Sequence, residues 1–307
     1  MKAPLPQQLR VIERGWLSAN NIVFHEGENA AVVDTGYVSQ AAQTLEMMRQ
    51  VLDGRQLTRI VNTHSHSDHI GGNASLKRAY GCSITIPSGI ATAVENWDEE
   101  FLLLSSAGQS GERFVHDAVL RAGDEFELGG LVWQALAAPG HDMEALVFYC
   151  QAKRLLISGD ALWRDGFGIQ FAELSGQAAG LAATKATLES IGRLSVEVVI
   201  PGHGAPFVEF DDALERAMKR VAAFAQDPQR MARNAMKALF IFKLLEIGRL
   251  QVDGLADYLN AIPYFRDVFP RLEHASPEAL AAWLLQDLLR AGVIVLRDGD
   301  ILPTQTA

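Results

Sequence analysis

The chain has 307 residues, of which 49% are hydrophobic and 21% are charged, so it is long enough for one large domain or for a large domain with a small one. Its formal charge of −10 at pH 7 argues against a surface that attracts nucleic acid or anionic lipid as a whole. The N-terminal residues lack the apolar core of a signal peptide, and no apolar run is long enough to span a membrane. We therefore expect a cytoplasmic protein with no membrane partner. Its two cysteines, Cys82 and Cys150, lie in apolar runs typical of buried, reduced thiols.

Short apolar runs alternate with helical patterns over the first two hundred residues. A first strand is predicted at Val11–Arg14, and Asn21–His25 with Ala30–Asp34 predicts a hairpin. The apolar spacing from Ser39 to Leu52 predicts a helix capped by Ser39. Further strands are predicted at Leu57–Asn62, Cys82–Ile86, Leu131–Leu136, Leu146–Cys150, Arg154–Ser158 and Val196–Ile200. Three further helices are predicted: one that ends near Tyr80, a short one that starts at Ser88, and a long one at Leu181–Arg193. Because hairpins interrupt the crossovers, we expect a mixed α/β fold and not a purely parallel sheet.

The segment Trp97–Leu104 begins an insertion in this alternation. It has the composition of a lid over a nearby site and equally that of a peripheral amphipathic helix. The sequence leaves both alternatives open.

Four potential metal ligands fall within six residues, directly after the strand at Leu57–Asn62: His64, His66, Asp68 and His69. In an extended chain the first two project to the same side, and a helix that starts near Asp68 would turn the other two toward a second point. One metal rarely needs four ligands so close in sequence, whereas two adjacent metals do. Imidazole and carboxylate suit zinc, iron, cobalt or manganese. We set aside a merely histidine-rich surface loop, because the motif follows a strand and ends in two glycines.

Three further candidate ligands lie where other predicted strands end. His141 follows a Pro-Gly turn, Asp160 ends an apolar run, and His203 lies between two glycines. Each has an ordinary explanation by itself, as a solvated turn residue or a hydrogen-bonded histidine. Together they repeat one arrangement, in which a strand end delivers a ligand to a common rim.

This set of seven residues resembles the metallo-β-lactamase superfamily, and Val33–Gly36 matches the early aspartate motif of that superfamily. The resemblance covers about the first two-thirds of the chain and implies an αββα sandwich with two divalent metal ions. It implies one metal on His64, His66 and His141, a second on Asp68, His69 and His203, and Asp160 bridging both. It also makes Asp34 a buried residue that holds the ligand loop, a role that is compatible with a turn or cap aspartate.

Two divalent ions about 3.5–4 Å apart can share a water and lower its pKa toward neutrality, which supplies hydroxide for hydrolysis. We expect zinc, with iron or manganese as alternatives. Asp160 and Asp68 are the predicted catalytic carboxylates, with Asp68 also a candidate proton relay. The substrate is expected to be a small molecule.

The loop after Asp160 is rich in aromatic residues and carries one arginine. We predict that Trp163, Phe167 and Phe171 line an apolar pocket and that Arg164 meets a carboxylate or phosphate of the substrate. The equal alternative is that these aromatics pack the loop and the arginine is solvated.

The sequence divides into a catalytic domain at residues 1–208 and a smaller, mainly helical domain at residues 209–307. Helices at Asp211–Phe224, Arg230–Ile247, Val252–Leu259 and Ser276–Arg290 precede a hairpin around Asp298-Gly299. This pattern resembles a winged helix, as in the β-lactamase-like protein 2 branch of the superfamily. The last helix has one basic and two acidic residues, so we do not expect nucleic acid as a partner. Packing, pocket-building or homodimer formation is the expected role.

Three function classes follow. The first is a metal-dependent hydrolase of a small ester, thioester or lactone, similar to the glyoxalase II and lactonase branches, although no dense C-terminal basic cluster for a glutathione carboxylate is evident. The second is a nuclease or phosphodiesterase of the winged-helix branch. The third is an iron-dependent oxygenase or a non-catalytic regulator. An exported β-lactamase is disfavoured, because no export signal is visible.

Overall fold

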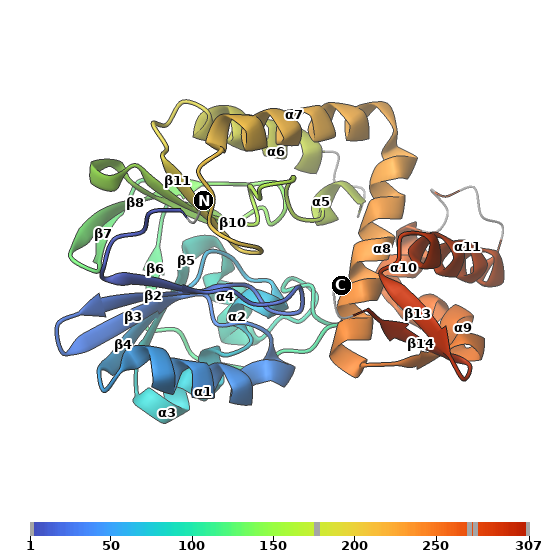
Figure 1. Cartoon of the computed structure of the whole chain (residues 1–307), viewed down its shortest axis with the longest axis horizontal. Coiled ribbons are helices and arrows are strands. Elements are labelled where there is room, and N and C mark those ends of the chain that lie inside the picture. The colour runs from blue at the N-terminus through green and yellow to red at the C-terminus, as the bar shows by residue number, and fades with distance from the viewer. Residues whose placement is uncertain (1–2, 175–178, 269–271, 273–275, 305–307) are drawn as a thin grey trace.

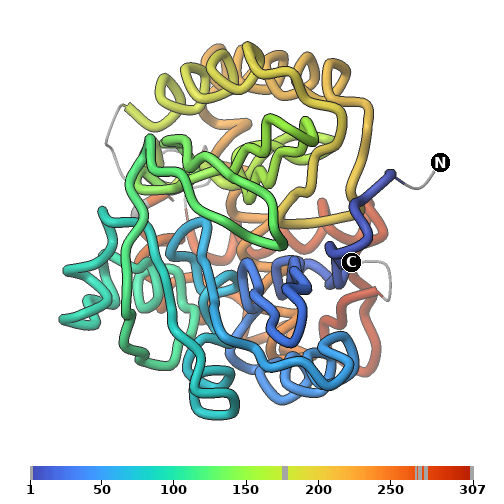
Figure 2. The backbone as a smooth tube through the Cα atoms, turned by 90° about the vertical axis from the view of Figure 1, so that its left-hand side faces the viewer, coloured from blue at the N-terminus to red at the C-terminus, as the bar shows by residue number. Residues whose placement is uncertain are grey.

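Two β-sheets lie face to face, and each is covered on its outer face by helices (Figure 1). The computed structural model describes residues 3–174, 179–268, 272 and 276–304. Turned by 90°, Figure 2 shows the same stack, with α6 (Gly180–Ile191) and α7 (Phe210–Gln226) together on one outer face. The predicted αββα sandwich is confirmed.

The first sheet comes from the N-terminal part of the chain. Its strands, in spatial order, are β1 (Leu9–Ile12), β2 (Asn21–Glu26), β3 (Asn29–Val33), β4 (Gln56–Val61), β5 (Ser83–Pro87) and β6 (Ala118–Leu120). The first three strands are antiparallel, and β3 to β6 run parallel. The connections carry α1 (Ala41–Leu52), α2 (Ser67–Ile70), α3 (Asn73–Tyr80) and α4 (Ala91–Asn96), with single 3-10 turns at Val38–Gln40 and Ser88–Ile90.

Successive residues of these strands face two different cores. On β3, Ala30 and Val32 pack toward the helices α1 and α3, whereas Ala31 and Val33 pack toward the second sheet. This is the two-residue period of a strand. Because both faces of β3 are buried, the strand is a continuous apolar run and not an alternating one.

The second sheet has the spatial order β11 (Val198–Pro201), β10 (Leu155–Gly159), β9 (Leu146–Cys150), β8 (Leu131–Ala137) and β7 (Glu125–Leu128). The core between the sheets is built around Phe24, Trp133 and Phe148, whose rings are fully buried. α5 (Phe171–Leu174) and a 3-10 turn at Gln151–Lys153 lie in its connections. Both cysteines are buried and free.

The C-terminal part continues from α7 into the long helix α8 (Pro228–Ile247). It then forms α9 (Leu255–Ala261), α10 (Pro263–Val268) and α11 (Pro277–Arg290), with a 3-10 turn at Val252–Gly254 and a small sheet of β12 (Leu250–Gln251), β14 (Asp300–Pro303) and β13 (Ile294–Arg297). Asp298 and Gly299 both have positive φ in the two-residue hairpin turn, as an Asp-Gly pair favours. One apolar core joins α6, α7, α8 and α11, so the division after residue 208 stays a prediction.

Several sequence predictions differ from the structure in detail. Ser39 is not the cap of α1: it lies inside a 3-10 turn, and the capping position is Gln40, with no side-chain bond. The strands β6, β7 and β12 and the helix α10 were not predicted, because all are short and α10 has no separate apolar pattern. Trp97–Leu104 forms turns and no helix, which removes the peripheral-helix alternative. Among the described residues, no helix has the length and apolarity needed to cross a bilayer.

Candidate metal centre

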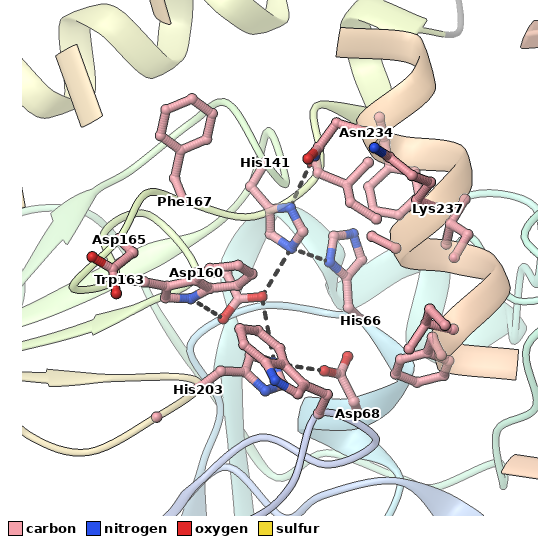
Figure 3. A pocket seen from close by; sticks show the side chains of 18 of the residues that line it. His66, Asp68, His141, Asp160, Trp163, Asp165, Phe167, His203, Asn234 and Lys237 are labelled. Atoms are coloured by element: carbon pink, nitrogen blue, oxygen red, sulfur yellow. Dashed lines mark hydrogen bonds and ion pairs between the residues drawn. The ribbon is translucent and has the colours of Figure 1, made fainter. Parts of the chain in front are cut away.

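All seven predicted ligands converge at one edge of the sandwich, and all are buried. Figure 3 shows five of them, His66, Asp68, His141, Asp160 and His203, with their side chains pointing toward one another. The histidine motif follows β4 and runs into α2, while the other three residues follow β8, β10 and β11. Strand ends on both sheets therefore deliver ligands to one rim, as the sequence predicted.

The ligand atoms form three overlapping groups, each compact enough to hold a metal ion. In the group of His64, His66 and His141, Nδ1 of His66 lies 2.7 Å from Nε2 of His141. In the group of Asp68, His69 and His203, Nε2 of His203 lies 3.0 Å from Oδ2 of Asp68.

Asp160 lies between these two groups. Its Oδ1 is 3.4 Å from Nε2 of His69, and its Oδ2 is 3.3 Å from Nε2 of His141 and 3.8 Å from Nε2 of His203. One carboxylate therefore faces imidazoles of both groups. This is the position that a bridging ligand requires.

Asp34 organises the back of the centre. Its Oδ2 lies 2.8 Å from Nδ1 of His69 and accepts a hydrogen bond of 2.8 Å from the Thr63 hydroxyl, while its Oδ1 accepts from the Thr63 amide at 2.9 Å. The Thr63 oxygen lies 3.0 Å from Nδ1 of His64. Since a carboxylate only accepts, Nδ1 of His69 carries its proton, and the Thr63 oxygen, whose own proton goes to Asp34, accepts from His64. Both rings thus direct Nε2 into the centre.

A backbone carbonyl orients His141 in the same manner. Nδ1 of His141 lies 2.6 Å from the oxygen of Ile169, so this nitrogen donates and Nε2 faces the ligand cluster. The buried Nε2 atoms of His64 and His69 have no hydrogen-bond partner among the described residues. Buried polar atoms are normally satisfied, and nitrogens aimed at a common point fit a metal ion. The residues present therefore fit a bound divalent metal, which the resemblance found in the sequence implies.

The electrostatics favour positive charge at the centre. Burial lowers the pKa of His64 well below its usual value and that of His66 to about 3, so both rings are neutral, as metal ligands must be. Burial also acts to lower the pKa of His69, but Asp34, Asp160 and Asp68 outweigh it and raise that pKa well above its usual value. Burial would raise the pKa of Asp160, yet His69 and His203 hold it well below the usual range. The carboxylates around His69 therefore stabilise a positive charge at its Nε2 atom.

A cavity of about 740 Å³ opens in front of the centre. His66, Asp68, His141, Asp160 and His203 form its floor, and side chains of α8 form the opposite wall. The wall includes Asn234 and Lys237, which are labelled in Figure 3. It also includes Leu239, Ile241 and Phe242, with Leu288 and Val293 from the C-terminal part of the chain. The C-terminal part therefore helps to build this pocket.

The four pocket residues predicted from the loop after Asp160 all line this cavity. Trp163 donates from Nε1 to Oδ1 of Asp160 at 3.1 Å, and the Phe171 ring lies 5.0 Å from that of His66. Phe167 is buried and packs beneath the Arg220 guanidinium. Arg164 is about half exposed and lies 3.3 Å from Glu209, so a substrate anion would have to compete with that carboxylate.

Sequence reasoning missed the cavity wall that α8 provides, and it also missed two residues beside the ligands, Trp16 and Asp142. Trp16 stacks on His203 with ring centroids 5.3 Å apart, and the sequence holds no motif that indicates it. Asp142 accepts from the Ser65 hydroxyl at 2.8 Å and ties two ligand loops together; its place next to His141 is the available signal. Leu103 of the Trp97–Leu104 segment lines the cavity, and a lid function for this segment stays a prediction.

Comparison with known proteins supports the fold and the metal centre. Residues 14–203, more than half of the chain, match the family described as the metallo-beta-lactamase superfamily. The chain is 32% identical over 166 residues to a hydroxyacylglutathione hydrolase of Methylococcus capsulatus, covering 53% of this chain and 54% of that protein. It is 28% identical over 149 residues to one of Rhodopseudomonas palustris, covering 48% and 50%. The chain thus spans about half the length of the curated relatives it matches.

Solved structures share the fold at lower identity. A metallo-beta-lactamase family protein from Thermus thermophilus superposes with a TM-score of 0.60 at 20% identity, covering 98% of this chain and 100% of that one. A class B3 di-zinc metallo-beta-lactamase from an Alaskan soil metagenome gives 0.54 at 18% identity, covering 73% and 99%. The Thermus match extends over the C-terminal helices as well as the sandwich.

Proposed function

The chain belongs to the metallo-beta-lactamase superfamily, and we propose that this metal-dependent hydrolase cleaves a small thioester at a centre of two zinc ions. The observation that carries the proposal is the cluster of seven buried ligands, with Asp160 between two groups, at the floor of a cavity of about 740 Å³. About half of the chain is similar to hydroxyacylglutathione hydrolases. This similarity leads us to favour a thioester substrate over an ester or a lactone.

In this proposal His64, His66 and His141 would hold one ion, and Asp68, His69 and His203 would hold the other. Asp160, which lies between the two groups, would serve both. Bound divalent ions supply Lewis acidity, which polarises a carbonyl and lowers the pKa of water toward neutrality. The Nε1–H of Trp163 orients the Asp160 carboxylate. Asp68 lines the cavity, where its carboxylate can take the proton of the attacking water and pass it to the leaving thiolate.

The cavity walls provide the binding for the rest of the substrate. Phe171, Phe242 and Ile241 present apolar surface that suits an acyl chain, and Trp16 and Trp163 form an aromatic edge, with centroids 5.3 Å apart, beside His203. Such a pocket, mostly apolar with a few polar groups, is typical of sites for small organic ligands. Arg164 would meet an anionic substituent once released from Glu209.

Two other functions stay as alternatives. A phosphodiesterase would use the same metal pair on a phosphoryl oxygen, and an iron-dependent oxygenase would use the same ligand types for redox chemistry. Zinc as the native metal, cytoplasmic location and a homodimer stay predictions.

The test combines metal analysis of the purified chain with a panel of thioester, lactone and phosphodiester substrates. We expect two equivalents of zinc and turnover of thioesters, with His66→Ala and Asp160→Asn abolishing most of that turnover. The matched controls are His25→Ala and Asp53→Asn, at positions that do not line the cavity. Near-normal turnover of both metal-site variants, or activity confined to phosphodiesters, would contradict the proposal.

A further inference from the structure

A second cavity, of about 860 Å³, lies between α7, α8 and α11. We refer to it as the cationic cleft, because six basic side chains and two carboxylates line it: Arg216, Lys219, Arg220, Arg230, Arg233 and Lys237, with Asp227 and Asp287. The chain as a whole has 27 basic against 37 acidic residues. The cleft is therefore locally positive, although the chain as a whole has a net negative charge.

The helical repeat explains how these side chains meet. Arg216, Lys219 and Arg220 recur along α7 at spacings of three and four residues, which place them on one face of the helix. Arg230, Arg233 and Lys237 recur in the same way along α8. The two helices meet at a steep angle around residue 227 (Figure 1). Both basic faces therefore border the same corner.

Only some of these charges are compensated within the protein. Lys237 pairs with Asp287 at 2.8 Å, and the Arg216 guanidinium donates to the Arg164 carbonyl and lies 3.5 Å from Asp165. Within the described part of the chain, neither Arg220 nor Arg230 has a carboxylate within ion-pair distance, and the buried Nε of Arg220 has no hydrogen-bond partner. Burial lowers the pKa of Arg220, and the nearby Arg230 lowers it further. Two cations that repel each other fit a site for an anion.

The cationic cleft adjoins the cavity of the metal centre. Arg220, Asn234 and Lys237 line both cavities, so the two cavities are neighbours, and an extended molecule that passes these three side chains would reach both. Its scissile group would face the metal ligands while its anionic end lies between α7 and α8. Trp283 lines the cleft as well and offers a flat apolar surface beside the charges.

We propose that the cationic cleft binds phosphate groups on the leaving thiol of the substrate, so that the enzyme hydrolyses thioesters of a phosphorylated, nucleotide-bearing thiol. This inference rests on the proposed thioester hydrolysis. Phosphate suits the cleft, because guanidinium groups match its oxygens in a bidentate geometry and several cations can share its multiple charges. A single carboxylate carries one negative charge and could neutralise only one of Arg220 and Arg230.

A polynucleotide is the weaker candidate for the same charges. Nucleic-acid binding needs a basic track that follows many phosphates, whereas these six residues gather around one corner between α7 and α8. α11 presents Asp287 to that corner, and the whole chain carries a charge of −10. A short phosphorylated group is therefore favoured.

The binding test uses adenosine 5′-diphosphate as the probe for the full-length chain, measured by calorimetry at low and high salt. We expect salt-sensitive binding that Arg230→Gln weakens by about tenfold or more, as the loss of one charge-assisted hydrogen bond predicts. The matched control is Arg249→Gln, because Arg249 is exposed and lies outside both cavities. No binding of the probe, or equal binding by both variants, would overturn the proposal.

The kinetic test compares one acyl group on coenzyme A and on N-acetylcysteamine, which lacks the phosphates. Arg230→Gln should lower the ratio of kcat/KM for these two thioesters about tenfold, and Arg249→Gln should keep it. A ratio near one in the wild type would overturn the inference. Arg230-dependent binding of the probe without turnover of either thioester would support the phosphate site and refute thioester hydrolysis. Arg230-dependent cleavage of RNA would assign the cleft to a polynucleotide instead.

Discussion

Asp34→Asn tests whether the hydrogen-bond network behind the centre sets the affinity for metal. The substitution keeps the size of the side chain, and the backbone tolerates it, because Asp34 has φ of 57° and asparagine also adopts the left-handed region. It replaces one accepting oxygen by an NH2 group. The Asp34 carboxylate faces four donors: the Thr63 amide, the Thr63 hydroxyl, Nδ1 of His69 and, at 3.4 Å, the Asn62 side-chain amide. At least one of them must therefore meet another donor.

The magnitude follows from those contacts. A buried donor left without a partner costs about 1–3 kcal/mol, and loss of a group that orients metal-binding histidines typically lowers metal affinity by about 10–100-fold. The loss of the Asp34 charge also weakens the field that favours a cation on Nε2 of His69. We expect a fall in zinc affinity within that range, and a melting temperature of the metal-free chain lower by several degrees.

The assay is competition with a chelator of known affinity, combined with thermal unfolding of the metal-free and zinc-loaded chain. Asp53→Asn is the matched control, because Asp53 also has positive φ but is exposed and its carboxylate lies 3.6 Å from Arg55. Zinc affinity of Asp34→Asn equal to that of the wild type and of this control would refute the reasoning.

Three further predictions concern single positions. A methyl group at Gly202 would overlap Oδ1 of Asp160, so Gly202→Ala should lose zinc in metal analysis while its circular dichroism stays native; full zinc content would contradict this. Trp163→Ala should raise KM for apolar substrates and Arg164→Ala should raise KM for anionic ones, which steady-state kinetics on matched substrates will check; unchanged constants would remove both from the pocket. Burial raises the pKa of the Cys82 thiol to about 11, so mass spectrometry should find no alkylation by iodoacetamide at pH 8 in the native chain, and alkylation only after unfolding.

The ligand positions could be predicted from the sequence, because short-range geometry of the chain decides where these side chains point. His64 and His66 follow a strand and Asp68 and His69 begin a helix, so a few residues of chain decide that they meet. Asp160 and His203 end apolar runs that form β10 and β11, and strand ends lie at sheet edges by construction. The αββα fold was predictable from the resemblance that these residues carry.

Contacts between segments far apart in sequence were decided only by the tertiary structure. Trp16 reaches His203, and Lys237 on α8 comes to line both cavities, although no local pattern links either to the metal centre. The regular spacing of basic residues along α7 and α8 could be read from the sequence. It did not indicate a binding site, because a row of arginines is ordinarily a solvated helix face. Only the angle at which the two helices meet turns both rows toward one cleft, and that angle depends on packing against α6 and α11.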